Sequence, residues 1–159
     1  MNNLSGGGAI ALIGNPNSGK TALFNALTGL NHKVSNYPGV TVERKTGSCT
    51  IGDDTIEIID LPGTYSLVPE SQDEVIVAME VDSWLESDHA PACIISVVDA
   101  TNLERNLYLT SQLLDLGIPV IVALNMMDLA RNKSLTIDAE KLNSTLGTAA
   151  IVPISARYR

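Results

Sequence analysis

One segment near the N-terminus constrains the fold more than any other part of the chain. The segment Gly14–Thr21 reads Gly-Asn-Pro-Asn-Ser-Gly-Lys-Thr and fits the pattern G-x-x-x-x-G-K-[ST]. It follows the apolar run Ala9–Ile13, which predicts a buried strand, and it opens a helix predicted over Gly19–Thr28. The backbone N–H groups of such a loop, together with the helix N-terminus, form a cradle for a polyphosphate.

Every residue of this segment is a predicted phosphate-binding position. We expect Lys20 to reach the β- and γ-phosphates and the Thr21 hydroxyl to bind Mg²⁺. The alternative is a glycine-rich turn that only caps a helix, and the preceding strand argues against it. The predicted positions are Gly14, Asn15, Pro16, Asn17, Ser18, Gly19, Lys20 and Thr21.

Apolar runs alternate with helical periodicity along the rest of the chain, which predicts a mainly parallel sheet with helices on both faces. We expect six strands, at Ala9–Ile13, Val42–Ile51, Thr55–Asp60, Ala92–Val98, Ile118–Leu124 and Ala150–Ile154. Besides Gly19–Thr28, we expect helices at Gln72–Ser87, Leu103–Leu116 and Ile137–Leu146, and long loops at Asn31–Thr41 and Leu61–Ser71. The fold class is therefore three-layer α/β, of the P-loop NTPase type.

The periodicity of Gln72–Ser87 predicts an inward face made of Val77, Val81, Trp84 and Leu85. The length of 159 residues fits one domain over residues 9–159, after a flexible N-terminus at 1–8. The chain stops directly after the last predicted strand, so we expect the final covering helix of a doubly wound sheet to be missing.

The composition argues against several classes of protein. The net charge is −8, which disfavours nucleic-acid binding and a basic membrane-binding patch. No apolar run approaches the ~20 residues of a membrane span, and the N-terminus lacks the features of a signal peptide. Cys49 and Cys93 are expected to be buried, reduced thiols of a cytosolic domain.

Between Lys45 and Arg105 the chain has acidic residues but no Lys or Arg. We expect these acids to form a solvated face that aids solubility. The alternatives are a docking face and a weak site for a hard cation such as ferrous iron.

Two further positions complete a predicted magnesium site. Asp60 ends a predicted strand and begins Asp-Leu-Pro-Gly, so its carboxylate can hold Mg²⁺ while the N–H of Gly63 donates to the γ-phosphate. Thr41 lies in the first long loop, where its hydroxyl can complete the Mg²⁺ shell. Alone these signals are weak, because Asp-x-x-Gly turns are common, but their position downstream of Gly14–Thr21 makes them specific.

A third loop carries the residues expected to recognise a base. Asn125-Met126-Met127-Asp128 follows a predicted strand. The carboxylate of Asp128 can only accept hydrogen bonds, so it matches the adjacent N1–H and N2–H₂ donors of guanine and is left unpaired by adenine. Asn125 is expected to brace this loop and to touch the base. The alternative for the Asn-x-x-Asp segment is an Asx turn or a helix cap. The following segment Ser155-Ala156-Arg157 is expected to offer a backbone N–H to guanine O6.

These motifs, in this order at strand ends, resemble those of Ras-like GTPases. Within that fold, four segments are similar to the ferrous-iron transport protein B family: Gly14–Phe24, Asn36–Arg44, Asp60–Leu67 and Val98–Leu109. The resemblance runs from about Ile10 to Ala156 and points to the N-terminal cytosolic G domain of that family.

The resemblance implies a function for a longer parent protein. It implies Mg²⁺-dependent hydrolysis of GTP to GDP that drives or gates Fe²⁺ uptake. The parent would carry a helical domain and a polytopic membrane region, with the G domain on the cytoplasmic face of the bacterial inner membrane.

The resemblance also adds site residues. It implies K⁺ bound by Asn17 and by the backbone carbonyls of Ser35 and Tyr37, where many members have Gly and Trp. Because Thr64 replaces the glutamine that orients water in Ras-like enzymes, we expect slow intrinsic hydrolysis. The implied catalytic residues are Lys20, Asn17, Thr41 and Gly63, and the added nucleotide-binding positions are Gly39, Val40, Thr41, Val42, Glu43, Asp60, Leu61, Pro62 and Gly63.

Two alternatives remain open from the sequence. The domain could act as a nucleotide-controlled conformational switch in which turnover only resets the state. It could also belong to a soluble ribosome-assembly GTPase, although that class usually carries a basic RNA-binding appendage.

Overall fold

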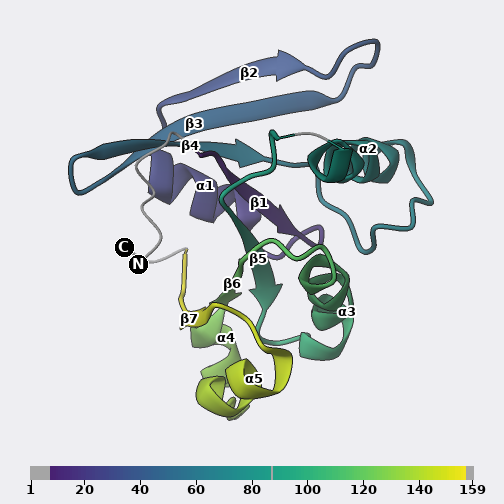
Figure 1. Cartoon of the computed structure of the whole chain (residues 1–159). Coiled ribbons are helices and arrows are strands. Elements are labelled where there is room, and N and C mark those ends of the chain that lie inside the picture. The colour runs from purple at the N-terminus through teal and green to yellow at the C-terminus, as the bar shows by residue number, and fades with distance from the viewer. Residues whose placement is uncertain (1–7, 87, 157–159) are drawn as a thin grey trace.

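The computed structural model describes residues 8–86 and 88–156, which form one sheet and its covering helices (Figure 1). The expected flexible N-terminus, apart from Gly8, lies outside these residues. The strands are β1 (Ile10–Gly14), β2 (His32–Asn36), β3 (Glu43–Ile51), β4 (Asp54–Asp60), β5 (Cys93–Asp99), β6 (Val120–Asn125) and β7 (Ala150–Pro153). The helices are α1 (Lys20–Thr28), α2 (Gln72–Glu86), α3 (Leu103–Leu114), α4 (Met127–Asn132) and α5 (Ala139–Leu146).

The sheet is mainly parallel, as the sequence predicted. Its strand order is β2-β3-β4-β1-β5-β6-β7. The central strand β1 pairs in parallel with β4 and β5, and β6 and β7 continue this parallel arrangement. The hairpin β3–β4 and the edge pair β2–β3 are antiparallel. The carboxyl ends of β1, β4, β5 and β6 therefore meet at one edge, where sheets of this kind bind ligands.

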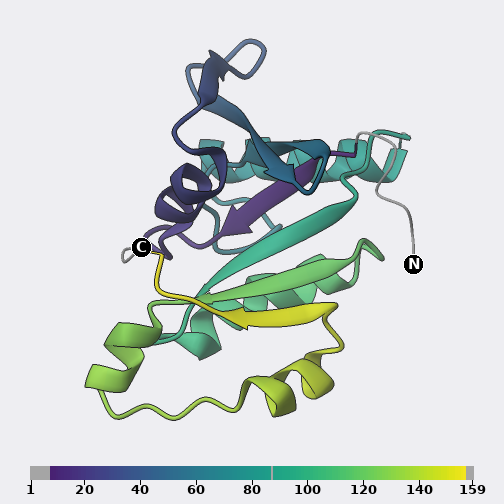
Figure 2. The same ribbon diagram turned by 90° about the vertical axis from the view of Figure 1, so that its left-hand side faces the viewer.

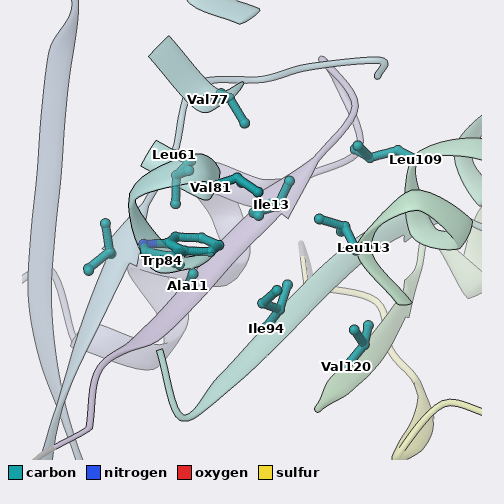
Figure 3. Packing of buried hydrophobic residues seen from close by; sticks show 11 residues of the cluster. Ala11, Ile13, Leu61, Val77, Val81, Trp84, Ile94, Leu109, Leu113 and Val120 are labelled. Atoms are coloured by element: carbon teal, nitrogen blue, oxygen red, sulfur yellow. The ribbon is translucent and has the colours of Figure 1, made fainter. Parts of the chain in front are cut away.

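Side chains of β1 alternate between two apolar clusters, one on each face of the sheet. Leu12 packs in the cluster that contains Phe24 of α1. Ala11 and Ile13 point to the opposite cluster, which contains Trp84 of α2 and residues of α3 (Figure 3). Because successive side chains of a strand face opposite ways, a strand covered on both faces must be apolar throughout, as Ala9–Ile13 is. The helices α4 and α5 lie beside β7 at one end of the sheet (Figure 2).

The sheet has seven strands, so the prediction of six was wrong. The added strand, β2, lies within Asn31–Thr41, which was predicted as a loop. All five residues of β2 are exposed. It therefore lacks the apolar alternation that marks a half-buried strand.

Two helical features also differ from the prediction. The helix α4 was not predicted, since a helix of 6 residues is too short to show periodicity. Leu85 was expected to face inward but is 59% exposed. The inner stripe of α2 contains Val77, Val81 and Trp84, and Leu85 falls beside that stripe. The other predicted elements occur with their ends shifted by a few residues.

In the described part of the chain, no helix combines the length and apolar character needed to cross a membrane. Cys49 in β3 and Cys93 in β5 are free thiols. Both are partly exposed rather than buried as expected, although burial still raises the pKa of Cys93.

Candidate functional site

The loop between β1 and α1 has the backbone geometry of a phosphate cradle. Asn17 and Gly19 both have positive φ angles, of 63° and 89°, and α1 begins at Lys20. A Cβ atom on Gly19 would lie 2.1 Å from Nδ2 of Asn125, so only glycine fits this position. Asn15 and Ser18 are buried, and their Nδ2 and Oγ atoms have no hydrogen-bond partner among the described residues. The predicted loop is confirmed as a strand–turn–helix unit with polar atoms left for a ligand.

A first cavity, with a volume of about 450 Å³, gathers the predicted magnesium ligands. Thr21, Thr41 and Asp60 all line it, although they come from α1, the loop before β3 and the end of β4. The Lys20 ammonium forms an ion pair with the Asp60 carboxylate at this point. The remaining lining residues are Val42, Glu43, Lys45, Leu61, Pro62, Gln72 and Asp73.

A second cavity, of about 670 Å³, joins the phosphate cradle to the predicted base-binding loop. Its lining includes Asn17 and Gly63 at one side and Asp128 and Ala156 at the other. The full lining is Asn15, Pro16, Asn17, Gly19, Lys20, Thr21, Ala22, Gly63, Asp73, Asn125, Met126, Asp128, Leu129 and Ala156. Lys20, Thr21 and Asp73 line both cavities, so the two form one continuous site.

Asn125 connects the phosphate cradle to the last loop. Its Nδ2 donates to the carbonyl of Ser18 at 3.0 Å, and its Oδ1 accepts the N–H of Ala156 at 2.9 Å. Asn125 thus braces this end of the site through backbone groups. The N–H of Ala156, in the segment predicted to donate to guanine O6, donates to Asn125 instead in this structure.

The Asn125–Asp128 loop has a sharp bend at Met126, whose φ is 62°. The N–H of Asp128 then donates to Ser155 Oγ at 3.2 Å, which fixes the start of α4 against the last loop. Asp128 is half-buried and lines the second cavity, where its carboxylate is an acceptor. Met127 packs against the core instead, and the predicted Arg157 lies outside the described residues.

The segment Leu61–Ser71, called here the second loop, closes over the cradle. A Cβ atom on Gly63 would lie 3.2 Å from Cα of Pro16, so the two backbones are in close contact. The N–H of Thr64 donates to the carbonyl of Gly14 at 3.1 Å. The Thr64 hydroxyl donates to the carbonyl of Ser66 at 2.6 Å, so it is engaged within the second loop.

A carboxylate that the sequence did not single out holds this second loop. Glu74 of α2 is only 8% exposed. Its Oε1 accepts the N–H of Tyr65 at 3.2 Å, and its Oε2 accepts the N–H of Glu70 at 2.9 Å. The Thr64 hydroxyl, whose shorter contact is to Ser66, also lies 3.3 Å from Oε1 and shares its one proton between the two acceptors. The N–H groups of Glu70 and Tyr65 hold the pKa of Glu74 below its usual value.

The residues 37–42, called here the first loop, are anchored mainly through Tyr37. Tyr37 is 7% exposed, whereas Ser35, Asn36, Pro38, Gly39 and Thr41 are all exposed. Burial, and then the nearby Glu80 carboxylate, raise the pKa of the Tyr37 phenol to about 12. Its Oη has no hydrogen-bond partner among the described residues.

Ser35 and Tyr37, the predicted K⁺ ligands, line neither cavity. Ser35 lies in β2 opposite Arg44 of β3, and the carbonyl of Tyr37 accepts the N–H of Val40 at 3.3 Å. Gly39 and Val40 of the same turn also lie outside the lining of both cavities. Asn17 is exposed in the cradle.

The sequence analysis assigned no role to Lys45, Gln72 and Asp73, which line the first cavity, or to Glu74, which holds the second loop. The Ser71–Glu74 spacing does fit S-x-x-E, a helix-start signal, and the N–H of Glu74 donates to Ser71 Oγ at 3.3 Å. That signal locates the start of α2 but gives no hint that the Glu74 carboxylate reaches back to the second loop. In residues 8–86 and 88–156, no group of three or more His, Cys, Asp and Glu side chains is arranged to hold a metal ion.

The order of the strands, the cradle and the three loops defines the class of protein: this is a P-loop GTPase fold. The family model for "Ferrous iron transport protein B" matches residues 8–159, and the chain belongs to that family, as its N-terminal G domain.

Individual relatives agree with this assignment. The chain is 59% identical over 149 residues to the Fe(2+) transporter FeoB of Legionella pneumophila (strain Lens), covering 91% of this chain and 19% of the relative. It is similar to the cytosolic domain of L. pneumophila FeoB, with a TM-score of 0.86 and 56% identity over 93% of this chain and 62% of that one. A GDP-bound mutant of the S. thermophilus FeoB G-domain has a TM-score of 0.85 and 50% identity, over 96% of this chain and 56% of that one.

Proposed function

We propose that the chain binds guanine nucleotides and hydrolyses GTP to GDP in a reaction that depends on Mg²⁺. The observation that carries this proposal is the continuity of the two cavities, which share Lys20, Thr21 and Asp73. A triphosphate spans such a site with its phosphates in the cradle and its base beside Asp128. The GDP complex of the S. thermophilus G-domain supports the proposal.

The residues of the first cavity suit a magnesium ion. Thr21, Thr41 and Asp60 supply hydroxyl and carboxylate oxygens, which are the ligands that Mg²⁺ prefers. When bound, the ion neutralises charge that develops on the phosphate oxygens. Lys20, paired with Asp60 in this structure, is placed to transfer its hydrogen bonds to the β- and γ-phosphates.

Hydrolysis proceeds by in-line attack of water on the γ-phosphorus, and the backbone does most of the positioning. Gly63 lies against Pro16, so its N–H is close to the place of the γ-phosphate. The Thr64 hydroxyl is engaged by Ser66 and does not replace the missing glutamine. We therefore expect slow turnover, with the attacking water held by backbone groups.

Selectivity for guanine is assigned to Asp128. Its half-buried carboxylate lies in the lining of the second cavity and accepts, but does not donate, hydrogen bonds. Guanine satisfies it with two donors, whereas adenine leaves it unpaired at a cost of about 1–3 kcal/mol.

Potassium is proposed to accelerate hydrolysis by adding positive charge beside the phosphates. Asn17 is exposed in the cradle and can supply its side-chain oxygen. For the carbonyls of Ser35 and Tyr37 to join it, the first loop must leave its present turn, because the Tyr37 carbonyl is bonded to Val40.

The parent function proposed is ferrous-iron uptake gated by the nucleotide state of this domain. The chain spans 19% of the length of its FeoB relative, so the helical and transmembrane parts that respond to the nucleotide lie in the rest of such a protein. The domain would sit on the cytoplasmic face of the bacterial inner membrane, without inserting into it and without contacting nucleic acid. The family match favours this function over ribosome assembly.

A turnover assay tests the proposal. Phosphate release from GTP by the chain, with Mg²⁺, should be faster in K⁺ than in Na⁺ at equal ionic strength, and should vanish when Mg²⁺ is chelated. The variant Lys20→Ala is the matched control, since it removes the phosphate-binding ammonium. Single-turnover hydrolysis that is negligible in both salts, with GTP still bound, would favour the nucleotide-controlled switch instead.

A substitution at Asp128 tests the assignment of the base. Asp128→Asn should move the preference from GTP toward XTP, because the amide donates to the extra carbonyl of xanthine. We expect a change in relative affinity of at least about tenfold, corresponding to about 1.4 kcal/mol. Calorimetric titration with both nucleotides measures it, and an unchanged preference for GTP would remove Asp128 from this role.

A further inference from the structure

Two side chains of α3 hold the middle of the second loop. The Arg105 guanidinium lies over the ring of Tyr65, 4.1 Å from its centroid. The N–H of Leu67 donates to Oε1 of Gln112 at 2.9 Å. Arg105 and Gln112 are seven residues apart, about two turns, so both side chains leave α3 on the same side.

The residues that α3 holds are directly connected to the catalytic backbone. Tyr65 follows Thr64, whose N–H is bonded to the carbonyl of Gly14, and Gly63 packs on Pro16. Tyr65, the first residue that α3 contacts, is separated from Gly63 by the single residue Thr64. Few backbone torsions therefore lie between the α3 contacts and the N–H of Gly63. A displacement of Tyr65–Leu67 is therefore transmitted to the phosphate cradle.

The two helices hold the second loop with contacts of different character. Glu74 of α2 is buried, and its charged carboxylate accepts two N–H groups of the loop, those of Tyr65 and Glu70. The α3 contacts are one neutral hydrogen bond from half-buried Gln112 and one cation–π contact from exposed Arg105. Neutral and exposed contacts are weaker than charge-assisted buried ones, so α3 is the side from which the loop is more easily released.

We propose that Gln112, assisted by Arg105, is a positioning residue for GTP hydrolysis that acts by holding Tyr65–Leu67 in the conformation that presents Gly63 to the γ-phosphate. The inference rests on the proposed GTPase activity. Neither residue touches the cavities, so both act through the second loop. A ligand or partner that moves α3 would change the hydrolysis rate without entering the nucleotide site.

The test compares three variants on one helix. Gln112→Ala removes the acceptor, Gln112→Glu retains an oxygen at the same length, and Ser111→Ala is the control. Ser111 is exposed, and its hydroxyl donates within α3 to the carbonyl of Tyr108. Each variant is examined for GTP turnover, GDP affinity, thermal unfolding and hydrogen exchange at the Leu67 amide.

Gln112→Ala should lower kcat about two- to fivefold and raise the exchange rate of the Leu67 amide by a similar factor, as expected for one lost hydrogen bond. The KM for GTP, the Kd for GDP and the Tm should stay close to those of the wild type. Gln112→Glu should restore most of kcat, and Ser111→Ala should have no effect. Arg105→Ala should lower kcat less, by about twofold.

The outcomes separate this inference from the proposed function. If the wild-type chain hydrolyses GTP and Gln112→Ala leaves both kcat and the Leu67 exchange rate unchanged, the positioning role is wrong and the GTPase proposal stands. If Gln112→Ala lowers Tm and all other parameters together, with no rescue by Gln112→Glu, Gln112 is structural only. If the wild-type chain binds GTP without turnover, both proposals are overturned.

Discussion

The two loops at the phosphate end of the site are held in opposite ways. The first loop connects the edge strand β2, whose residues are all exposed, to the partly buried strand β3, and its buried anchor is Tyr37. The second loop is bonded to the cradle by Thr64, to α2 by Glu74 and to α3 by Gln112. A loop with one apolar anchor can leave the rest of the fold as a unit once that anchor is lost. A loop held by several hydrogen bonds must break them one after another, so its conformation changes in steps.

This difference indicates a division of work between the loops. The first loop carries Thr41, and the proposed role of the Tyr37 carbonyl at K⁺ requires this loop to move, because that carbonyl is bonded to Val40. The second loop carries Gly63, whose close contact with Pro16 suits a group that must already be in place. We therefore expect the first loop to respond to the nucleotide by rearranging and the second by tightening.

The largest effect is expected from removal of the first loop's anchor. Tyr37→Ala should lower the free energy of unfolding by about 2–4 kcal/mol, since it empties the space of a buried aromatic ring. Urea denaturation measures the loss. Hydrogen exchange should accelerate at the amides of residues 39–42 and stay unchanged at the Leu67 amide, because the two loops are anchored separately.

The matched variant for this prediction is Tyr37→Phe. The Tyr37 hydroxyl has no partner in the described residues, so its removal should change the unfolding free energy by less than about 0.5 kcal/mol. If Tyr37→Ala accelerates hydrogen exchange in both loops, the loops form one cooperative unit. That result would contradict the statement that they are held independently.

A smaller effect is expected at the second loop's carboxylate. Glu74→Gln keeps one acceptor oxygen but loses the other and the charge, so the unfolding free energy should fall by about 1–2 kcal/mol. In this variant the hydrogen-exchange rate should rise at the amides of Tyr65 and Glu70 and stay unchanged in the first loop. Glu80→Gln, on the same helix, serves as the control; an equal loss of stability there would show that charge on α2, not the hydrogen bonds, is responsible.

Changes of pH around neutrality are expected to have the smallest effects on stability. The second loop should respond only at acidic pH, through Glu74, and the first loop only at alkaline pH, through Tyr37. The lowered pKa of Glu74 means that its carboxylate stabilises the fold at neutral pH and that this contribution is lost as the pH falls through the folded-state pKa, below 4.5. The raised pKa of Tyr37 means that its neutral phenol contributes fully below pH 10.0 and that this contribution is lost as the pH rises toward about 12. Amide chemical shifts of residues 64–70 during acid titration, and phenolate absorbance during alkaline titration, measure the two transitions. An early phenolate signal that is absent from Tyr37→Phe would contradict the second.

The buried parts of the fold were predictable from the sequence because burial leaves a pattern. The strands β1, β5 and β6 are short apolar runs that end at glycine or polar loops, and α2 shows its inner stripe as Val77, Val81 and Trp84. The strand β2 left no such pattern, because it sits at the sheet edge with every side chain exposed. Its hydrogen bonds to β3 are made by the backbone, which the residue types do not report.

The residues of the site also fall into two groups, those that a sequence pattern predicts and those whose contacts depend on the fold. Short motifs with fixed spacing predict Lys20, Thr21, Asp60 and Asp128, and each of these residues lines at least one of the two cavities. The contacts of Glu74 and Gln112 were not predicted, because each accepts backbone N–H groups across a fold-dependent distance, so no spacing rule applies. Tyr37 was singled out for its carbonyl, whereas its ring is the buried part.

The side chain of Asn125 has a consequence for how nucleotide leaves the protein. The Asn125 amide donates through Nδ2 to the carbonyl of Ser18 and accepts the N–H of Ala156 through Oδ1. It fits there because Gly19 has no side chain at the place that Nδ2 occupies. If the base and the phosphates bind as proposed, this amide links the two ends of the nucleotide site. We therefore expect the walls around the base and around the phosphates to open together, when the Asn125 side chain breaks both hydrogen bonds, rather than independently.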